Sequence, residues 1–156
     1  MKKFELTTES ITNAVGKKLF RIKALIDFGD VKAGELGGYV EKEGNVSQDG
    51  DAWVTGNAEV FSNAKVFGDA RVSGNAKVSG NADYALVQGF GTEFRCTTFY
   101  RGKNKKIMVN CGCFHGDLEE FRKQVKETRS GKIAKEYLMI AGLMEYHFAS
   151  EDSSNE

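Results

Sequence analysis

A six-residue repeat of the form Gly/Ser-Asn/Asp-Ala-x-Val-x constrains this chain more than any other feature of its sequence. Successive units begin at Gly50, Gly56, Ser62, Gly68, Gly74 and Gly80. The alanine and the valine of each unit are two positions apart, so in an extended strand both side chains point to the same side. The Gly-Asn and Gly-Asp pairs supply residues that tolerate a left-handed φ. The chain is therefore expected to alternate very short strands with sharp corners.

This spacing resembles the hexapeptide repeats of left-handed parallel β-helix proteins, in which three units form one coil of about 18 residues. The resemblance implies an α+β fold with a short left-handed parallel β-helix over residues 38–86. So short a solenoid needs covered ends. Residues 18 positions apart would stack, which places Trp53 over Arg71. A β-sandwich of hairpins and a right-handed bactofilin-like solenoid remain open as alternatives.

The flanking segments are expected to cap the repeat. Residues 1–37 form an N-terminal cap with one alternating strand, LFRIKALI, and residues 87–150 form a C-terminal unit of a β-hairpin and two helices. The runs EFRCTTFY and KKIMVNCGCF predict the hairpin. Asp117 followed by Glu120 predicts a capping box at the first helix, and Gly131 its end. Residues 151–156 form a flexible acidic tail.

A second resemblance covers nearly the whole chain. The runs FGDVKAGELGGYVE and TTFYRGKNKKIMVNCGCFHGDLEEF, together with the hexads, are similar to small proteins of phages and prophages of Gram-positive bacteria. Those proteins join a hexapeptide-repeat helix to a domain with a Cys-Gly-Cys-Phe segment. Many small prophage proteins inhibit host defence, so the resemblance implies a phage-encoded inhibitor. In its sharpest form this is an anti-CRISPR protein that binds the effector nuclease and blocks its use of nucleic acid.

Composition narrows the classes of partner and the compartment. Lys+Arg is 22 and Asp+Glu is 22, which argues against a general nucleic-acid binder. No apolar stretch approaches the roughly 20 residues of a membrane span, and the N-terminal residues lack the apolar region of a signal peptide. Three cysteines do not suit a disulfide framework. We therefore expect the protein in the host cytoplasm.

A structural zinc site is one interpretation of the cysteines. If Tyr100 pairs with Ile107 in the hairpin, Cys96 lies opposite Cys111, and the remaining thiol and an imidazole follow on the same face. Three thiols and one imidazole match a closed tetrahedral zinc site. The candidate ligands are Cys96, Cys111, Cys113 and His115. The alternatives are small buried thiols and a redox pair at positions 111 and 113.

The sequence favours a binding protein over an enzyme. The hexapeptide acyltransferases use a histidine between coils, whereas His115 and His147 both lie outside the repeat. Nucleophile-elbow and P-loop motifs are absent. The expected partner is a host defence protein, without direct contact to nucleic acid. A self-assembling structural protein, hence a homo-oligomer, and an acyltransferase relative are the alternatives. The candidate partner-binding residues are Trp53, Phe61, Phe67, Arg71, Arg101 and Lys103.

Overall fold

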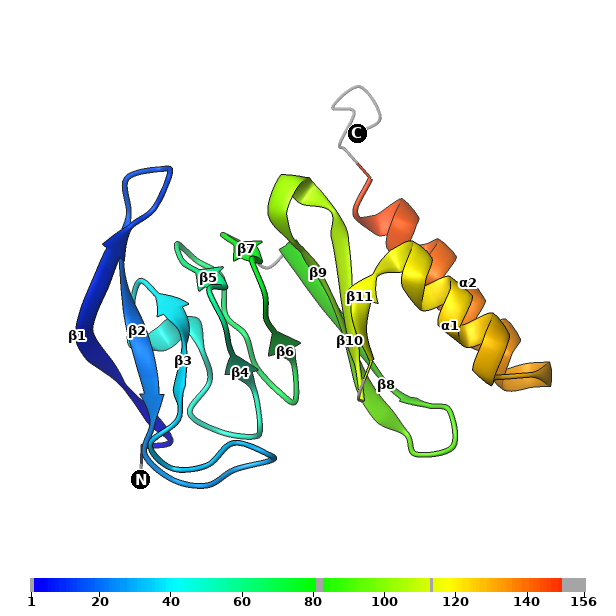
Figure 1. The fold of residues 1–156 in the computed structure, drawn as a ribbon, viewed down its shortest axis with the longest axis horizontal. Coiled ribbons are helices and arrows are strands. Elements are labelled where there is room, and N and C mark those ends of the chain that lie inside the picture. Colours follow the sequence, from blue (N-terminus) through cyan, green and yellow to red (C-terminus); the bar gives the residue numbers. More distant parts are fainter. Residues whose placement is uncertain (1, 81–82, 113, 150–156) are drawn as a thin grey trace.

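A computed structural model describes residues 2–80, 83–112 and 114–149. Its elements follow one another along the longest axis of the molecule (Figure 1). The N-terminal strands lie at one end, the repeat segment (residues 50–80) lies in the middle, and a second sheet and two helices follow. No helix among the described residues is long and apolar enough to cross a membrane.

The N-terminal strands and part of the repeat share one five-stranded sheet. Strands β1 (Phe4–Thr12), β2 (Lys18–Ala24) and β3 (Leu36–Val40) pair antiparallel in sequence order. The sheet continues in parallel through β5 (Glu59–Val60) and β7 (Lys77–Val78). The N-terminal segment therefore extends the sheet at one end of the repeat segment, and the short 3-10 turn η1 (Glu43–Asn45) follows β3.

The repeat segment stacks residues 18 positions apart, as its spacing predicts. Strand β4 (Trp53–Val54) pairs in parallel with β6 (Arg71–Val72), which places Trp53 opposite Arg71. Strands β5 and β7 keep the same spacing. The alanine and valine side chains of the repeats are buried in one core, which forms because both point to the same side of each short strand. This core also contains aromatic residues from both flanking segments.

The predicted left-handed parallel β-helix is nevertheless wrong as the fold of this chain. The strands of the described residues form three separate sheets of five, four and two strands, and none of these sheets closes or repeats as a solenoid. The parallel strands of the repeat span two residues each, whereas the longer strands pair antiparallel. The unit that begins at Ser62 forms no strand, and its Val66 makes only an isolated bridge to Val46. The repeat is too short to dominate over the antiparallel pairing of its flanks.

The second sheet is antiparallel and larger than the predicted hairpin. Its strands are β8 (Tyr84–Phe90), β9 (Arg95–Arg101), β10 (Ile107–Cys111) and β11 (Phe114–Asp117), in the order β11-β10-β9-β8. The 3-10 turn η3 (Lys103–Lys105) joins β9 to β10. The predicted hairpin is present as β9 and β10. Strand β8 begins within residues 38–86, the range predicted for the β-helix.

The two faces of the second sheet serve two cores. Tyr84 and Tyr100 belong to the core of the repeat segment, whereas their neighbours Phe99 and Val109 pack toward the helices. This separation follows from the alternation of side chains along a strand. The sheet therefore covers the end of the repeat segment with one face and carries the helices on the other (Figure 1).

Both helices form as predicted. Helix α1 (Leu118–Thr128) begins at a capping box, in which the Asp117 carboxylate accepts from the Glu120 amide at 2.8 Å. Helix α2 (Gly131–His147) buries one apolar side, which includes Tyr137, Ile140 and Met144, against the sheet and α1. The predicted role of Gly131 is wrong, because α1 ends at residue 128 and Gly131 opens α2 with φ of +60°.

Candidate functional site

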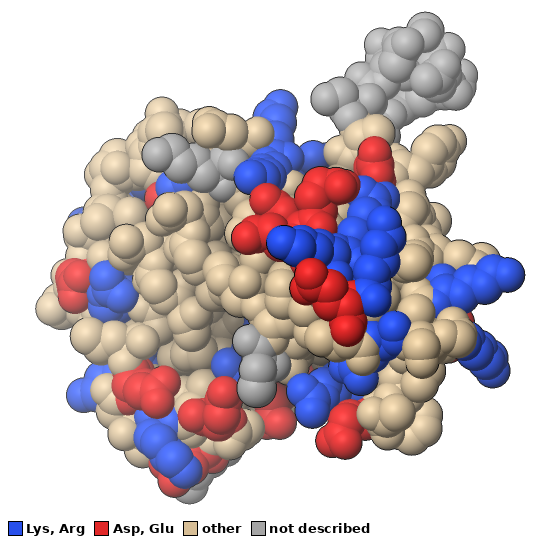
Figure 2. All heavy atoms as spheres, turned by 45° about the vertical axis from the view of Figure 1, so that its right-hand side comes forward, with Lys and Arg blue, Asp and Glu red and all other residues tan. Residues whose placement is uncertain are grey.

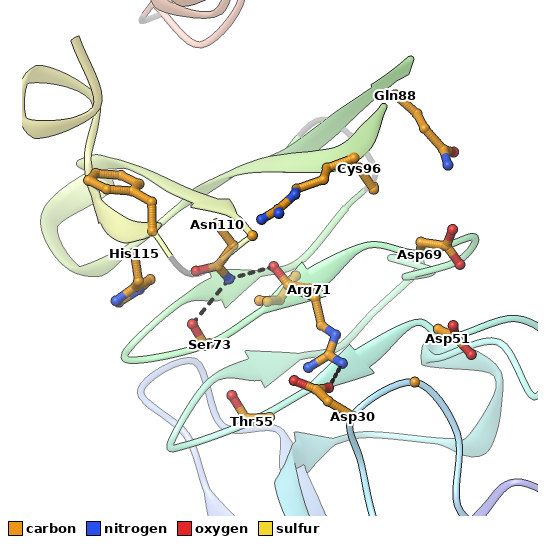
Figure 3. Close-up of a pocket in the computed structure, with 15 residues that line it drawn as sticks. Asp30, Asp51, Thr55, Asp69, Arg71, Ser73, Gln88, Cys96, Asn110 and His115 are labelled. Carbon is orange, nitrogen blue, oxygen red and sulfur yellow. Dashed lines mark hydrogen bonds and ion pairs between the residues drawn. The ribbon is translucent and has the colours of Figure 1, made fainter. Parts of the chain in front are cut away.

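A polar cleft of about 500 Å³ lies between the repeat segment and the second sheet. Side chains from the loop between β2 and β3, from β6 and from β8 to β11 converge on it (Figure 3). The labelled lining residues are Asp30, Asp51, Thr55, Asp69, Arg71, Ser73, Gln88, Cys96, Asn110 and His115. The cleft exists because the sheet covers the core of the repeat but does not close over its polar rim.

Arg71 forms the centre of the cleft floor. Its guanidinium pairs with the Asp30 carboxylate, and burial lowers the pKa of Arg71 below its ordinary value. An arginine keeps its charge despite such a shift. The backbone of Arg71 is also held, since its amide donates to Thr98 Oγ1 at 2.9 Å and its carbonyl accepts from Asn110 Nδ2 at 2.8 Å. These bonds fix the position of β6 against the second sheet.

Two further carboxylates, Asp51 and Asp69, stand one above the other at the side of the cleft (Figure 3). They are 18 residues apart and follow Gly50 and Gly68, whose φ angles are +70° and +65°. The glycines are close, because a Cβ on Gly50 would lie 2.8 Å from the carbonyl oxygen of Gly68. Both carboxylates are solvent-exposed, and neither forms an ion pair with another described residue. This pair can accept a cationic group.

The predicted register of the β9–β10 hairpin is wrong by one residue. Tyr100 pairs with Met108 rather than Ile107, and Cys111 therefore lies opposite Thr97. A shift of one residue reverses the face of every side chain. Cys96 accordingly lines the cleft, whereas Cys111 packs in the core below the helices and its Sγ accepts from Thr97 Oγ1 at 3.1 Å.

The four candidate zinc ligands consequently do not converge as predicted. Cys96 and His115 lie on the cleft side, Cys111 lies on the opposite face, and Cys113 is outside the described residues. The imidazole of His115 is instead 2.9 Å from the hydroxyl of Tyr100 through its Nε2 atom. Within the described ranges no three cysteine, histidine or carboxylate groups come close enough to hold a metal ion.

Two side chains in and beside the cleft, Cys96 and Tyr100, have shifted pKa values. Burial, aided by the nearby Asp69, raises the pKa of the Cys96 thiol above its ordinary value. A thiol that stays protonated at neutral pH is a weak nucleophile. Burial likewise raises the pKa of Tyr100, whose hydroxyl bonds to Ser73 as well as to the histidine. The cleft thus offers fixed charges and hydrogen-bonding groups on a tethered backbone.

An apolar groove of about 460 Å³ lies beside the cleft. Its lining residues are Phe67, Tyr84, Ala85 and Leu86. Phe67 is 51% exposed, and its ring meets that of Tyr84 edge-on at 6.2 Å. Tyr84 is anchored through its hydroxyl to the carbonyl of Lys65, and burial raises the pKa of Tyr84 to about 12.

Strand β8 joins the groove to the cleft. Tyr84, Ala85 and Leu86 line the groove at one end of the strand, and Gln88 lines the cleft further along. Strand β8 is also the edge of its sheet, since among the described strands it pairs only with β9. One open strand edge therefore runs from an apolar surface to a polar one.

The six predicted partner-binding residues have four different outcomes. Trp53 and Phe61 are buried by the N-terminal segment, so the prediction that they form a partner surface is wrong. Arg101 pairs with Asp83 and caps the carbonyl of Phe148, so it holds the end of α2. The side chain of Lys103 is outside the described part of the chain. The two that remain accessible are Phe67 in the groove and Arg71 in the cleft.

Sequence reasoning missed the carboxylates of the cleft and the exposed edge of β8. The repeat contained a signal for two of them, because Asp51 and Asp69 occupy the same position of units 18 residues apart. Asp30 and Gln88 come from the flanking segments, and only the folded chain brings them to the repeat. No protein-family model matches this chain, and no curated protein matches it. The similarity to phage proteins therefore stays a prediction from the sequence.

Proposed function

We propose that this protein is a non-enzymatic binding protein that holds an extended segment of a partner protein along the edge of β8. The observation that carries the proposal is the continuity of this edge with an apolar groove at one end and an acidic, polar cleft at the other. An open edge presents unpaired backbone N–H and C=O groups, to which an added strand can bond.

The two ends of the edge specify the side chains of the segment. An apolar residue fits beside Phe67, where it would remove a half-exposed aromatic ring from water. A lysine or arginine fits beside the exposed carboxylates of Asp51 and Asp69. Tyr84, Ala85 and Leu86 line the groove and Gln88 lines the cleft, so the two sites are two to four positions apart along β8. An added strand advances by the same distance per residue as β8, so we expect its apolar and basic residues to be about two to four positions apart as well.

The charge distribution supports a protein partner over nucleic acid. Nucleic-acid binding rests on clustered lysine and arginine side chains that neutralise phosphates. The helical end of the molecule instead carries intermingled acidic and basic side chains (Figure 2). The cleft likewise has carboxylates around its arginine. A host defence protein, with a CRISPR effector nuclease as the sharpest case, is the partner class that the similarity to phage proteins suggests.

Affinity capture with matched variants tests the proposal. The full chain is immobilised in three forms, wild type, Phe67→Ser and Leu36→Ser, and exposed to lysate of a CRISPR-bearing Gram-positive host. Leu36 is a suitable control because it is 54% exposed and lies in the N-terminal sheet, away from the groove. We expect wild type and Leu36→Ser to retain one protein in stoichiometric amount and Phe67→Ser to lose it. Equal recovery on all three forms, or recovery of none, would contradict the proposal.

A further inference from the structure

The outer face of helix α2 carries an apolar stripe that the described residues leave exposed. Met139 is 65% exposed, Leu143 is 58% exposed and Tyr146 is 83% exposed. The spacing of four and three residues places all three on one side of the helix. The opposite side is the one that packs on the sheet and on α1. The helix is thus apolar on two faces, and the described part of the chain covers only one of them.

A glycine lies within this stripe, and no described residue lies close enough to require the absence of a side chain there. Gly142 is helical and exposed, and a Cβ placed on it would meet nothing within 4 Å. Glycine is among the poorest helix formers, so an exposed interior position normally favours another residue. A small residue in an apolar helix face allows the backbone of a second helix to approach closely. The outer face of α2 therefore has the features of a helix–helix contact.

The charges on α2 indicate which second helix would pack against this stripe. Lys135 lies on the exposed stripe one turn before Met139. The exposed Glu145 flanks Tyr146 at the other end, where one of its carboxylate oxygens pairs with Arg122 of α1. Two parallel copies would bring Lys135 against Lys135. Two antiparallel copies would bring Lys135 of each beside Tyr146 of the other, which sets an ammonium against an aromatic ring. Lys135 would also approach Glu145, whose carboxylate has a second oxygen beside the one that pairs with Arg122.

We infer that α2 is a self-association surface, through which two copies of this chain form an antiparallel, two-fold symmetric dimer. In such a pair Met139 of each copy packs against Gly142 of the other, and each apolar stripe is removed from water. Each contact occurs twice, as two-fold symmetry requires. The dimer uses the end of the molecule opposite the N-terminal sheet and leaves the edge of β8 free (Figure 1).

Sedimentation equilibrium of the full chain over micromolar concentrations tests this inference. We expect a monomer–dimer equilibrium for wild type and for Leu36→Asp, an exposed leucine in the N-terminal sheet. Leu143→Asp should raise the dissociation constant at least about tenfold, because it buries a carboxylate in an apolar contact. A wild-type protein that stays monomeric throughout, or a dimer that Leu143→Asp leaves unchanged, would overturn the inference.

A charge exchange separates this antiparallel pair from other dimers and does not depend on the folding of the leucine variant. Lys135→Glu should weaken the dimer because it places like charges together. Glu145→Lys should also weaken it, and this variant loses the pair with Arg122 of its own α1 as well. The double variant Lys135→Glu/Glu145→Lys should regain most of the lost affinity. Failure of the double variant to recover would rule out the antiparallel arrangement. Binding of a partner at β8 is measured separately, so either result can fail alone.

Discussion

Lys3 donates hydrogen bonds to backbone carbonyls at the N-terminal end of the repeat segment, and its replacement by methionine should destabilise the fold. In the repeat, amides of one layer donate to carbonyls of the next, as Trp53 N does to Ala70 O at 3.1 Å. The first repeat unit, which contains Gly50 and Ala52, has no earlier repeat unit whose amides could donate to these two carbonyls. The Lys3 ammonium takes that place, because Nζ donates to the carbonyls of Ala52 at 2.7 Å and Gly50 at 3.2 Å. Lys3 is only 2% exposed.

The magnitude follows from the two carbonyls left without a donor. A buried polar group without a partner costs about 1–3 kcal/mol, so two would cost about 2–6 kcal/mol. Relief of the burial of an ammonium offsets part of this, and we expect Lys3→Met to lose about 2–4 kcal/mol. For a chain of this size that corresponds to a fall in Tm of about 6–12 °C. Methionine keeps the unbranched apolar stem, so little packing is lost.

Thermal and urea unfolding measure the effect, with Lys2→Met as the control. Lys2 is the adjacent residue, and among the described residues its ammonium makes only an exposed ion pair with Glu43. Its loss should therefore change stability by about 1 kcal/mol or less. Burial lowers the pKa of Lys3 below 10.5. Between that lowered pKa and 10.5 the unfolded chain binds more protons, so this lysine makes wild type gain stability as pH rises there. Lys3→Met should lack the gain. If the Tm of Lys3→Met lay within about 2 °C of that of wild type, this stabilising role of Lys3 would be refuted.

Three further predictions concern packing, capping and register. A Cβ on Gly38 would lie 2.7 Å from a backbone carbonyl oxygen, whereas one on Gly44 would meet nothing; Gly38→Ala should therefore cost about 1–3 kcal/mol in urea unfolding and Gly44→Ala close to none. Asp117→Ala should cost about 1 kcal/mol at pH 7. A hydrogen bond from a lysine lowers the pKa of Asp117 below 3.8, so the difference from wild type should vanish as the pH falls through that lowered value. Cys96 and Cys111 should remain unlinked after mild oxidation and peptide mapping, since they face opposite sides of the sheet; a linked peptide would contradict the register.

The sequence predicted local structure well where short-range chemistry decides it. The stacking of Trp53 on Arg71 follows from a fixed repeat length, and the capping box at Asp117 follows from two residues three positions apart. Both depend on contacts that the repeat or the helix itself supplies. The burial of Trp53 could not be predicted in this way, because Phe4 and Phe28 cover it from distant parts of the chain.

The candidate site depended on a register that the sequence does not specify. The turn between β9 and β10 holds Asn104 and Lys105 at φ of +61° and closes with a bond from Gly102 N to Lys106 O. This turn pairs Arg101 with Ile107, one residue from the predicted register, and so separates the cysteines. The predicted fold class is wrong for a related reason. The antiparallel pairing of the flanking strands depends on residues far apart in the sequence, and the repeat carries no information about it.

Hydrogen exchange of the strands in the presence of the captured partner tests the central claim most directly. The full chain is exchanged alone and with a saturating amount of the partner, and peptides from β8 and β10 are followed. Because β10 lies between β9 and β11, its amides serve as the internal reference. The account predicts slower exchange in β8, with β10 unchanged, since an added strand bonds to the open edge. Protection that appears elsewhere while β8 exchanges at its free rate would contradict it.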